Sequence, residues 1–223
     1  MTASDLDRLR IRLTEYRPIS LLSIISKVME TVVNKQLQNH LLNNKLISSG
    51  QFGFKPHHST ADLLTILAET WNASLDKSEE VCIVACDIKG AFDRMWHNGL
   101  LAKLRSKGVS GMLLTWLRSY LHERSIKVVL SGQSPDASPT NASVPQGSIL
   151  GPLLFSVFID DLVDTCENQL YLHDDDSTLI APIRSVHERA SVFTSLNRDL
   201  EKMRVWAAKW KVTFEPTKGL DAV

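Results

Sequence analysis

Three consecutive aspartates, Asp174, Asp175 and Asp176, are the residues of this chain best suited to chemistry. They lie between two apolar runs, so residues 170–180 predict a β-hairpin with an acidic turn. From residue 160 to residue 176 there are seven acidic residues and no Lys or Arg. Mg²⁺, which binds one or two carboxylates together with substrate phosphates, would relieve the repulsion between these charges. The turn is therefore a candidate metal site, and the alternative interpretation is a solvated acidic turn.

A further candidate carboxylate, Asp87, lies at the end of an apolar β-type run over residues 80–88. Open sheets usually place their chemistry where a buried strand ends. Gly90 and Phe92 follow almost at once, which favours a functional position for Asp87. For Asp93 the simpler interpretation is a capping residue at the turn into the next helix.

A turn of Pro145, Gln146 and Gly147 precedes an apolar helix predicted over residues 149–163. Pro152 falls in the first turn of this helix, where proline is tolerated. Such a turn exposes backbone N–H groups and one amide side chain, which together could meet a planar ligand. Alternatively, it serves only as a helix entry.

The elements that must position these residues follow from apolar spacing and from Gly/Pro punctuation. The first predicted helix carries a long apolar stripe, which we expect to pack in the core, and Thr60 is expected to cap the second. Helices are predicted over residues 21–43, 60–75, 97–106, 112–122 and 186–209, strands over 125–130 and 211–214, and a loop over 131–142.

The composition of 43% hydrophobic and 22% charged residues is typical of a globular chain of 223 residues. The formal net charge is zero, so a contact with nucleic acid would need local charge separation. Six basic residues face one acid between residues 103 and 127, and six face three between 198 and 218. These runs fit either a track for a polyphosphate or solvated helix faces.

The three cysteines are too few for a disulfide framework, which indicates a reducing compartment. Cys82 and Cys86 share one face of the predicted strand and are interpreted as small core residues rather than zinc ligands. The longest apolar run, residues 153–159, is too short to cross a bilayer, and no targeting signal is seen. We therefore expect an intracellular protein, in the cytoplasm or the nucleus, without membrane contact.

In this order, the strand-end Asp, the Pro-Gln-Gly turn and the Asp-Asp hairpin resemble the palm motifs of reverse transcriptases. The chain is most similar to the enzymes of non-LTR (LINE-type) retrotransposons, from Tyr16 to Lys218. Residues 16–20, Tyr-Arg-Pro-Ile-Ser, resemble the start of the fingers in that family. Residues 51–60 resemble its Gln-Phe-Gly-Phe-Arg motif, with Lys55 in place of the arginine.

The resemblance implies roles for particular side chains in a two-metal site with Mg²⁺, or Mn²⁺ as the alternative ion. The implied catalytic carboxylates, which also hold the metals, are Asp87, Asp175 and Asp176, with Ile88 added to the metal and nucleotide sets. Phe92 would exclude a ribose 2′-hydroxyl, and the remaining nucleotide-binding residues would be Lys55, Gln146, Gly147 and Lys218. Lys218 would lie near the leaving pyrophosphate. The implied partners are an RNA template, a DNA primer and deoxynucleoside triphosphates, and the oligomeric state stays open.

The fold implied is an α+β polymerase palm, an antiparallel sheet packed on helices, with helical fingers and with the thumb missing. Residues 1–15 are interpreted as the remnant of an upstream linker and 219–223 as a truncated end. The fingers–palm domain spans 16–218, with fingers over about 16–79 and 100–142 and palm over about 80–99 and 143–218.

The hairpin departs from the family pattern at His173 and Asp174, where an aromatic and a small residue, typically Ala, are usual. An extra carboxylate near a phosphodiester would be repelled by roughly a few kcal/mol, which slows a reaction by about a hundredfold or more. The hypothesis is that this copy is catalytically impaired. Milder departures are the acidic Asp160 and the Glu215 that replaces an Asn before proline.

The predicted function is thus RNA-directed DNA synthesis by nucleotidyl transfer. One alternative is a catalytically dead, nucleic-acid-binding remnant of the same fold. Another is a palm polymerase that uses ribonucleotides, against which Phe92 argues. The last alternative is a protein that has an acidic turn and matches the motifs by chance.

Overall fold

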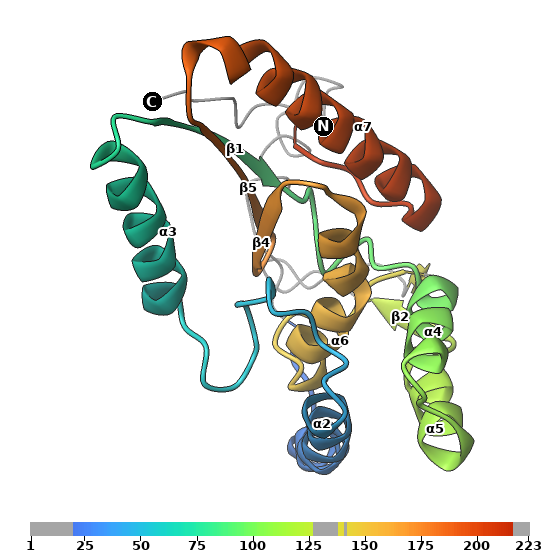
Figure 1. Cartoon of the computed structure of the whole chain (residues 1–223). Coiled ribbons are helices and arrows are strands. Elements are labelled where there is room, and N and C mark those ends of the chain that lie inside the picture. Colours follow the sequence, from blue (N-terminus) through green and yellow to red (C-terminus); the bar gives the residue numbers. More distant parts are fainter. Residues whose placement is uncertain (1–19, 127–137, 141, 216–223) are drawn as a thin grey trace, which may run out of the picture.

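The computed structural model describes residues 20–126, 138–140 and 142–215, and its helices and strands follow the predicted order closely (Figure 1). The helices and strands of the first half are α2 (Ile24–Asn43), α3 (Thr60–Leu75), β1 (Glu80–Asp87), α4 (His97–Ser106) and α5 (Gly111–Leu121). They are followed by β2 (Arg124–Ile126), β3 (Ser138–Thr140), α6 (Leu150–Ile159), the 3₁₀ helix η1 (Asp160–Thr165), β4 (Gln169–His173), β5 (Asp176–Ile183), η2 (Val186–Glu188) and α7 (Arg189–Trp210).

The main sheet is antiparallel, with the strand order β1-β5-β4. Because side chains alternate along a strand, each face of the sheet has its own core. Cys82, Val84 and Leu179 belong to the larger core, on the side of α6 and α7. Tyr171 and Ile180 belong to a smaller core, which α3 covers. Figure 1 shows α3 on one side of the sheet and α6 and α7 on the other.

Helix α6 is the centre of the larger core. All its residues except Pro152 are buried, and it packs against α2 and α4. Its apolar sequence has no polar face, so only a position enclosed by other elements suits it. The helix was predicted to continue to Val163, but it ends at Ile159 and the chain tightens into η1.

A second, two-stranded sheet corrects the predicted loop over 131–142. Strand β3 pairs antiparallel with β2, with Arg124 opposite Thr140. Residues 127–137 and 141 lie outside the described residues, so the predicted strand over 125–130 is described only as far as Ile126.

Two local predictions were also wrong in detail. Ser59, not Thr60, caps α3, because its hydroxyl accepts from the Asp62 N–H in a capping box. The strand predicted over 211–214 forms only an isolated antiparallel bridge, between Phe214 and Ile88.

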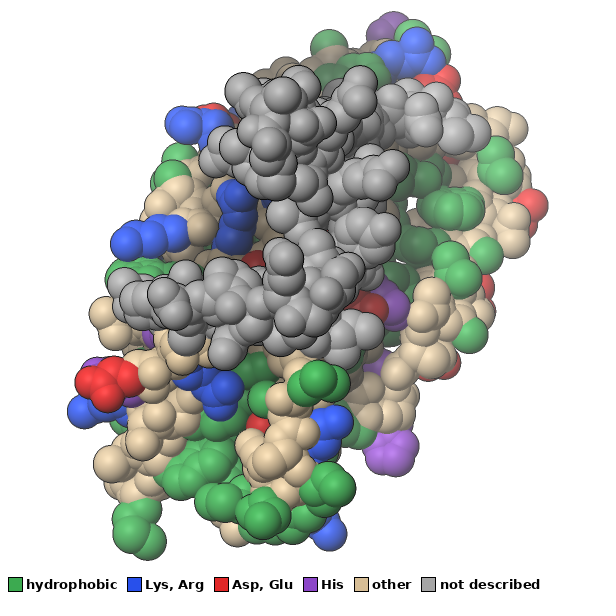
Figure 2. Space-filling model, turned by 180° about the vertical axis from the view of Figure 1, so that it is seen from behind, with side chains coloured by type: hydrophobic (Ala, Val, Ile, Leu, Met, Phe, Trp, Pro, Cys, Tyr) green, Lys and Arg blue, Asp and Glu red, His purple; other side chains and the backbone are tan. Residues whose placement is uncertain are grey.

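The apolar stripe of α2 is largely exposed, contrary to the prediction that it packs in the core. Leu37 and Leu41 are buried, whereas Leu21, Val28 and Val32 are between 55% and 98% exposed. Figure 2 shows hydrophobic side chains gathered at the lower end of the molecule, the end that α2 and α5 occupy in Figure 1. In the described part of the chain, no helix is long and apolar enough to cross a bilayer.

Candidate active site

Asp87 and Asp176 are directly opposite each other at one end of the β1–β5 ladder. Directly opposed residues of an antiparallel pair project to the same face, so the two carboxylates share one side of the sheet. His173 of β4 is in turn opposite Asp176, which extends this row across three strands. The Ile88 N–H donates to the Asp175 carbonyl at 2.9 Å. The fold therefore brings the three predicted catalytic aspartates to one end of the sheet.

The hairpin turns through only two residues, Asp174 and Asp175. Asp174 has φ 52°, as at the first central position of a type II′ turn, where glycine is preferred. Its carboxyl group is partly enclosed, and burial, together with the neighbouring Asp175 charge, raises the pKa of Asp174 against the opposing effect of His173. An acidic residue thus occupies a tight position that suits a smaller one.

The segment from Gly50 to Phe54 holds the hairpin from the edge of the sheet. The Leu172 N–H donates to the Gly50 carbonyl and the Phe52 N–H donates to the Leu172 carbonyl, both at 2.8 Å. A Cβ atom at Gly53 would overlap the backbone nitrogen of Asp174 and lie 2.7 Å from its Oδ1. Gly53 is thus a site-forming residue that the sequence analysis missed. The glycine between two phenylalanines could have indicated a close backbone contact, but the residue that it contacts, Asp174, is distant in sequence.

His173 joins the row of carboxylates to the start of α3. Its Nε2 lies 2.8 Å from the Thr60 hydroxyl, and its Nδ1 lies 3.8 Å from Asp174 Oδ2. His173 therefore makes polar contacts with both the start of α3 and the turn.

Carboxylates on neighbouring strands are a suitable oxygen-donor set for Mg²⁺, which needs only one or two of them when substrate phosphates complete its shell. Asp87 and Asp176 meet this requirement by their positions. Among the described residues, at this site or at any other, no three His, Cys, Asp or Glu side chains lie close enough together to hold a metal ion by themselves. Ile88 is buried, and its hydrocarbon side chain has no donor atom, so only its backbone carbonyl could serve as a ligand.

The charge imbalance over residues 160–176 is relieved largely by lysines and arginines from other elements. Lys107 Nζ lies 2.5 Å from Asp160 Oδ2, and Lys103 Nζ lies 2.5 Å from Asp161 Oδ1. Glu167 pairs with Arg198 and Lys202 of α7. Asp160, Asp161 and Glu167 therefore need no metal ion to balance their charges.

The predicted polyphosphate track on α4 is wrong for two of its residues. The Lys103 side chain is 5% exposed and lies over the rings of Phe158, Trp206 and Trp210, the last at 3.9 Å. Lys107 also turns inward, to the Leu46 carbonyl and Asp160. These two lysines make ion pairs within the fold and are not available to a nucleic-acid template.

Phe92 lies in the turn that follows β1, in contact with the larger core. Its ring centroid is 5.2 Å from that of Phe155 in α6 and 6.0 Å from that of Phe54. The Phe92 carbonyl accepts from the Val144 N–H at 2.9 Å, which joins this residue to the Pro-Gln-Gly turn.

The Pro-Gln-Gly turn is a type II β-turn. The Ser148 N–H donates to the Pro145 carbonyl at 3.0 Å, and Gly147 has φ 95°. The Gln146 amide nitrogen lies 3.2 Å from both carboxylate oxygens of Asp93. Asp93, interpreted from sequence as a helix cap, thus holds the side chain that was predicted to face the nucleotide.

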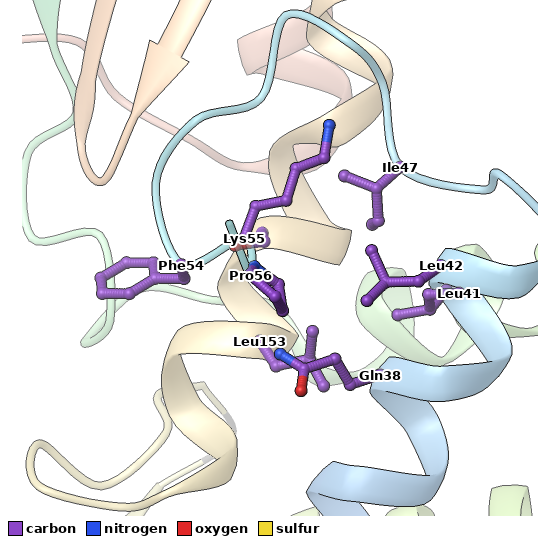
Figure 3. Close-up of a pocket in the computed structure, with 9 residues that line it drawn as sticks. Gln38, Leu41, Leu42, Ile47, Phe54, Lys55, Pro56 and Leu153 are labelled. Atoms are coloured by element: carbon purple, nitrogen blue, oxygen red, sulfur yellow. The ribbon is translucent and has the colours of Figure 1, made fainter. Parts of the chain in front are cut away.

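Lys55 is directed into the fold rather than toward the hairpin. Its ammonium donates to the Ser48 carbonyl at 3.0 Å, and burial lowers the pKa of Lys55 although Asp160 opposes this. Figure 3 shows the ammonium pointing away from Gln38 and Leu153, which line a hollow with room for roughly one water molecule. This hollow cannot hold a nucleotide.

Lys218 lies outside the described residues, but the chain that leads to it passes beside Asp87. The Glu215 N–H donates to the Asp87 carbonyl and the Lys89 N–H donates to the Thr213 carbonyl, both at 2.8 Å. The last described residues therefore form a further edge beside the strand that carries the first carboxylate.

Comparison with known proteins agrees with this arrangement. Residues 7–220 match the family described as reverse transcriptase (RNA-dependent DNA polymerase). The chain belongs to the reverse transcriptase family. This reverse transcriptase domain is 32% identical over 216 residues to the probable RNA-directed DNA polymerase from transposon BS of Drosophila melanogaster. It is also 32% identical over 211 residues to the RNA-directed DNA polymerase from mobile element jockey of the same organism.

These alignments cover 92% and 91% of the chain but only 23% of each relative. Among solved structures, a Candida albicans telomerase in complex with a fragment of telomeric RNA covers 98% of this chain and 36% of its own, with TM-score 0.63 and 14% identity. An apo telomerase from Candida tropicalis covers 83% of this chain and 35% of its own, with TM-score 0.57 and 14% identity. The likeness confirms the predicted α+β palm fold.

Proposed function

We propose that this reverse transcriptase domain carries out RNA-directed DNA synthesis in a retrotransposon protein. The oxygen of a primer 3′-hydroxyl forms a bond to the α-phosphorus of a deoxynucleoside triphosphate, the bond to pyrophosphate breaks, and the hydroxyl proton passes to solvent water. The observation that carries the proposal is the position of Asp87 directly opposite Asp176, on one face of the sheet.

Asp87, Asp175 and Asp176, with the Ile88 carbonyl, would hold two Mg²⁺ or Mn²⁺ ions. Such ions stabilise the charge on the attacking and leaving oxygens of an in-line displacement. The chain's own contribution is to fix the distance between β1 and the hairpin, which the Ile88–Asp175 hydrogen bond and the contact with Gly53 support.

Gln146 and Gly147 would present the turn to the incoming nucleotide, and Phe92 would limit the space beside its sugar. Lys55 would reach a phosphate only after leaving the Ser48 carbonyl. Lys218 would act on the leaving pyrophosphate. An RNA template and a DNA primer would be bound by fingers over about residues 16–79 and 100–142 and by a palm over about 80–99 and 143–218.

Metal-dependent primer extension tests the proposal. The chain is given an RNA template, a DNA primer and deoxynucleoside triphosphates, with Mg²⁺ or Mn²⁺ or with EDTA. We expect extension that requires the metal, is lost in Asp87→Asn and persists in Asp164→Asn, which changes an exposed carboxylate of η1. Extension that survives in Asp87→Asn, or that proceeds in EDTA, would contradict the proposal.

A second function, binding of nucleic acid without turnover, is favoured by one observation. Asp174 places an additional carboxylate in the turn, at φ 52° and in a partly enclosed position. A chain that retains template–primer in a mobility-shift assay, but extends no primer with either metal, would have this second function.

A further inference from the structure

Glu30 is the single carboxylate of α2 and has no part in the site described above. Its relative exposure is 1%, although its neighbours Met29 and Thr31 are exposed. Burying a carboxylate is strongly unfavourable unless hydrogen bonds compensate for the lost water. The partners of Glu30 therefore indicate why the chain keeps a charge at this position.

Those partners are the first amides of α6, 119 and 120 residues further along the chain. Glu30 Oε2 accepts from the Ile149 N–H at 2.8 Å and from the Leu150 N–H at 3.3 Å. Its other oxygen accepts from the Ser26 hydroxyl at 3.3 Å. The negative charge thus lies at the positive end of the α6 dipole, where it is stabilised.

The cap residue and the first three residues of α6 show how much depends on this contact. A helix leaves its first N–H groups without partners in its own backbone. Here the Gly151 N–H donates to the Ser148 hydroxyl at 2.9 Å, and Pro152 has no N–H. The other two, those of Ile149 and Leu150, both depend on Glu30, and the cap residue supplies no side-chain hydrogen bond.

The Gln146 turn is held from the same side. The Ser20 N–H, just before α2, donates to the Gln146 carbonyl at 3.0 Å. Tyr120 of α5 lies near the Glu30 contact, and burial, with the Glu30 carboxylate nearby, raises the pKa of Tyr120 to about 12. Ser20 and Glu30 therefore fix the two ends of the segment from Gln146 to Leu150.

From this geometry we infer that Glu30 is a positioning residue for nucleotide binding, which couples the fingers helix α2 to the Gln146–Gly147 turn of the palm. The inference rests on the proposed function, in which that turn meets the incoming nucleotide. Glu30 touches no substrate. It acts by holding the start of α6, and thereby the turn, in the orientation that receives the nucleotide.

The test compares Glu30→Gln with a matched variant, Asp199→Asn. Asp199 is also buried, at 0% exposure, and also accepts from two backbone N–H groups, those of Glu167 and Asn168, but these precede β4. Steady-state primer extension gives KM for the deoxynucleotide and kcat, and thermal unfolding gives Tm. We expect Glu30→Gln to raise KM by about threefold to tenfold, the usual range for a charge at a helix terminus, with kcat within about twofold. Asp199→Asn should lower Tm without changing KM.

A second variant tests the inference if Glu30→Gln does not fold. Ser26→Ala keeps the carboxylate and removes only the hydroxyl that orients it. We expect a smaller rise in KM, together with faster amide hydrogen exchange at Ile149 and Leu150.

The outcomes separate the two proposals. If the unchanged chain neither extends a primer nor binds a fluorescent deoxynucleotide, the proposed function fails and this inference fails with it. If the unchanged chain extends the primer, either of two results overturns only the positioning role of Glu30. In the first, KM for the deoxynucleotide is the same in Glu30→Gln as in Asp199→Asn, and in the second it is the same in Ser26→Ala as in the unchanged chain.

Discussion

Asp87 and Asp176 occupy directly opposed positions in the β1–β5 ladder, and both project to the α3 side of the sheet. Like charges in opposed positions destabilise an antiparallel pair, by about 0.2–1 kcal/mol relative to neutral pairs. A position selected only for stability would not pair two carboxylates. Their pairing is expected where function requires both charges at one point.

The first prediction follows from this opposition between stability and function. Asp176→Asn removes one of the opposed charges, so we expect Tm to stay unchanged or to rise by about 1–3 °C. The same change should lower the rate of primer extension by at least about a hundredfold, because a metal-binding carboxylate is lost. Thermal unfolding and primer extension on one preparation measure both effects, and a variant that is less stable and fully active would contradict this interpretation.

The second prediction concerns Asp174 and has a defined pH dependence. Because burial raises the pKa of this carboxyl, the folded chain binds its proton more tightly than the unfolded chain does. Stability from this group is therefore highest at low pH and falls as pH rises from the ordinary value of 3.8 through the raised one. Asp174→Asn removes this dependence and also tolerates φ 52° better.

We expect Asp174→Asn to raise Tm by about 1–2 °C at pH 7, a small effect because the half-exposed group is screened by solvent. Most of the gain should disappear at pH 3. In activity, Asp174→Gly and Asp174→Ala should extend a primer roughly a hundredfold faster than the unchanged chain, if the added charge impairs the reaction. Equal rates would show that the turn tolerates this charge.

The third prediction concerns the glycine beneath the hairpin. In Gly53→Ala the added methyl group would overlap the Asp174 backbone, so the turn or the Gly50–Phe54 segment must move. Overpacking of this kind destabilises by about 1–3 kcal/mol, or about 2–10 °C in Tm for a chain of this size. Primer extension should fall by about tenfold or more, because the moved turn carries Asp175. Ser49→Ala, which changes an exposed residue of the same loop, is the control and should change neither property.

The fourth prediction addresses the choice of sugar. Phe92→Val should admit ribonucleoside triphosphates, with discrimination falling by roughly tenfold to hundredfold, the usual steric range. Some stability should also be lost, because Phe92 contacts Phe155 and Phe54. Phe155→Leu is the matched control, since it weakens the packing behind Phe92 without shortening Phe92 itself. If the two variants discriminate equally, Phe92 does not select the sugar.

The order of the elements could be predicted from sequence because it depends on local patterns. The strand ending at Asp87 and the hairpin around residues 174–175 carry their signals in alternating apolar residues and turn residues, and the structure confirms both. The resemblance of the motifs also predicted the family correctly. Helix α6 was placed correctly but extended too far, since nothing local distinguishes its end from η1.

What could not be predicted depends on contacts between distant parts of the chain. Lys103 and Lys107 look like a basic helix face, and only the fold shows that Asp161 and Asp160 lie opposite them. The packing of Gly53 on Asp174, and of Glu30 on α6, involves residues more than one hundred positions apart. The apolar stripe of α2 predicted burial, because spacing shows which side of a helix is apolar and not what covers it.

The last prediction tests the inward position of Lys103. Burial, partly offset by Asp161, lowers the pKa of Lys103 to about 8, so the folded chain releases this proton more readily than the unfolded chain, for which 10.5 is the ordinary value. Stability from this group therefore rises with pH between about 8 and 10.5, and the unfavourable burial of the charge is fully present at pH 7.

Lys103→Met removes the charge, while Asp161 keeps its hydrogen bond from the Trp206 N–H and is 41% exposed. Between pH 7 and pH 10, the free energy of unfolding of the variant should fall by on the order of 2 kcal/mol relative to that of the unchanged chain. Urea unfolding at each pH measures this, with Lys209→Met, an exposed neighbour over Trp210, as the control; parallel pH curves for all three chains would contradict the buried charge.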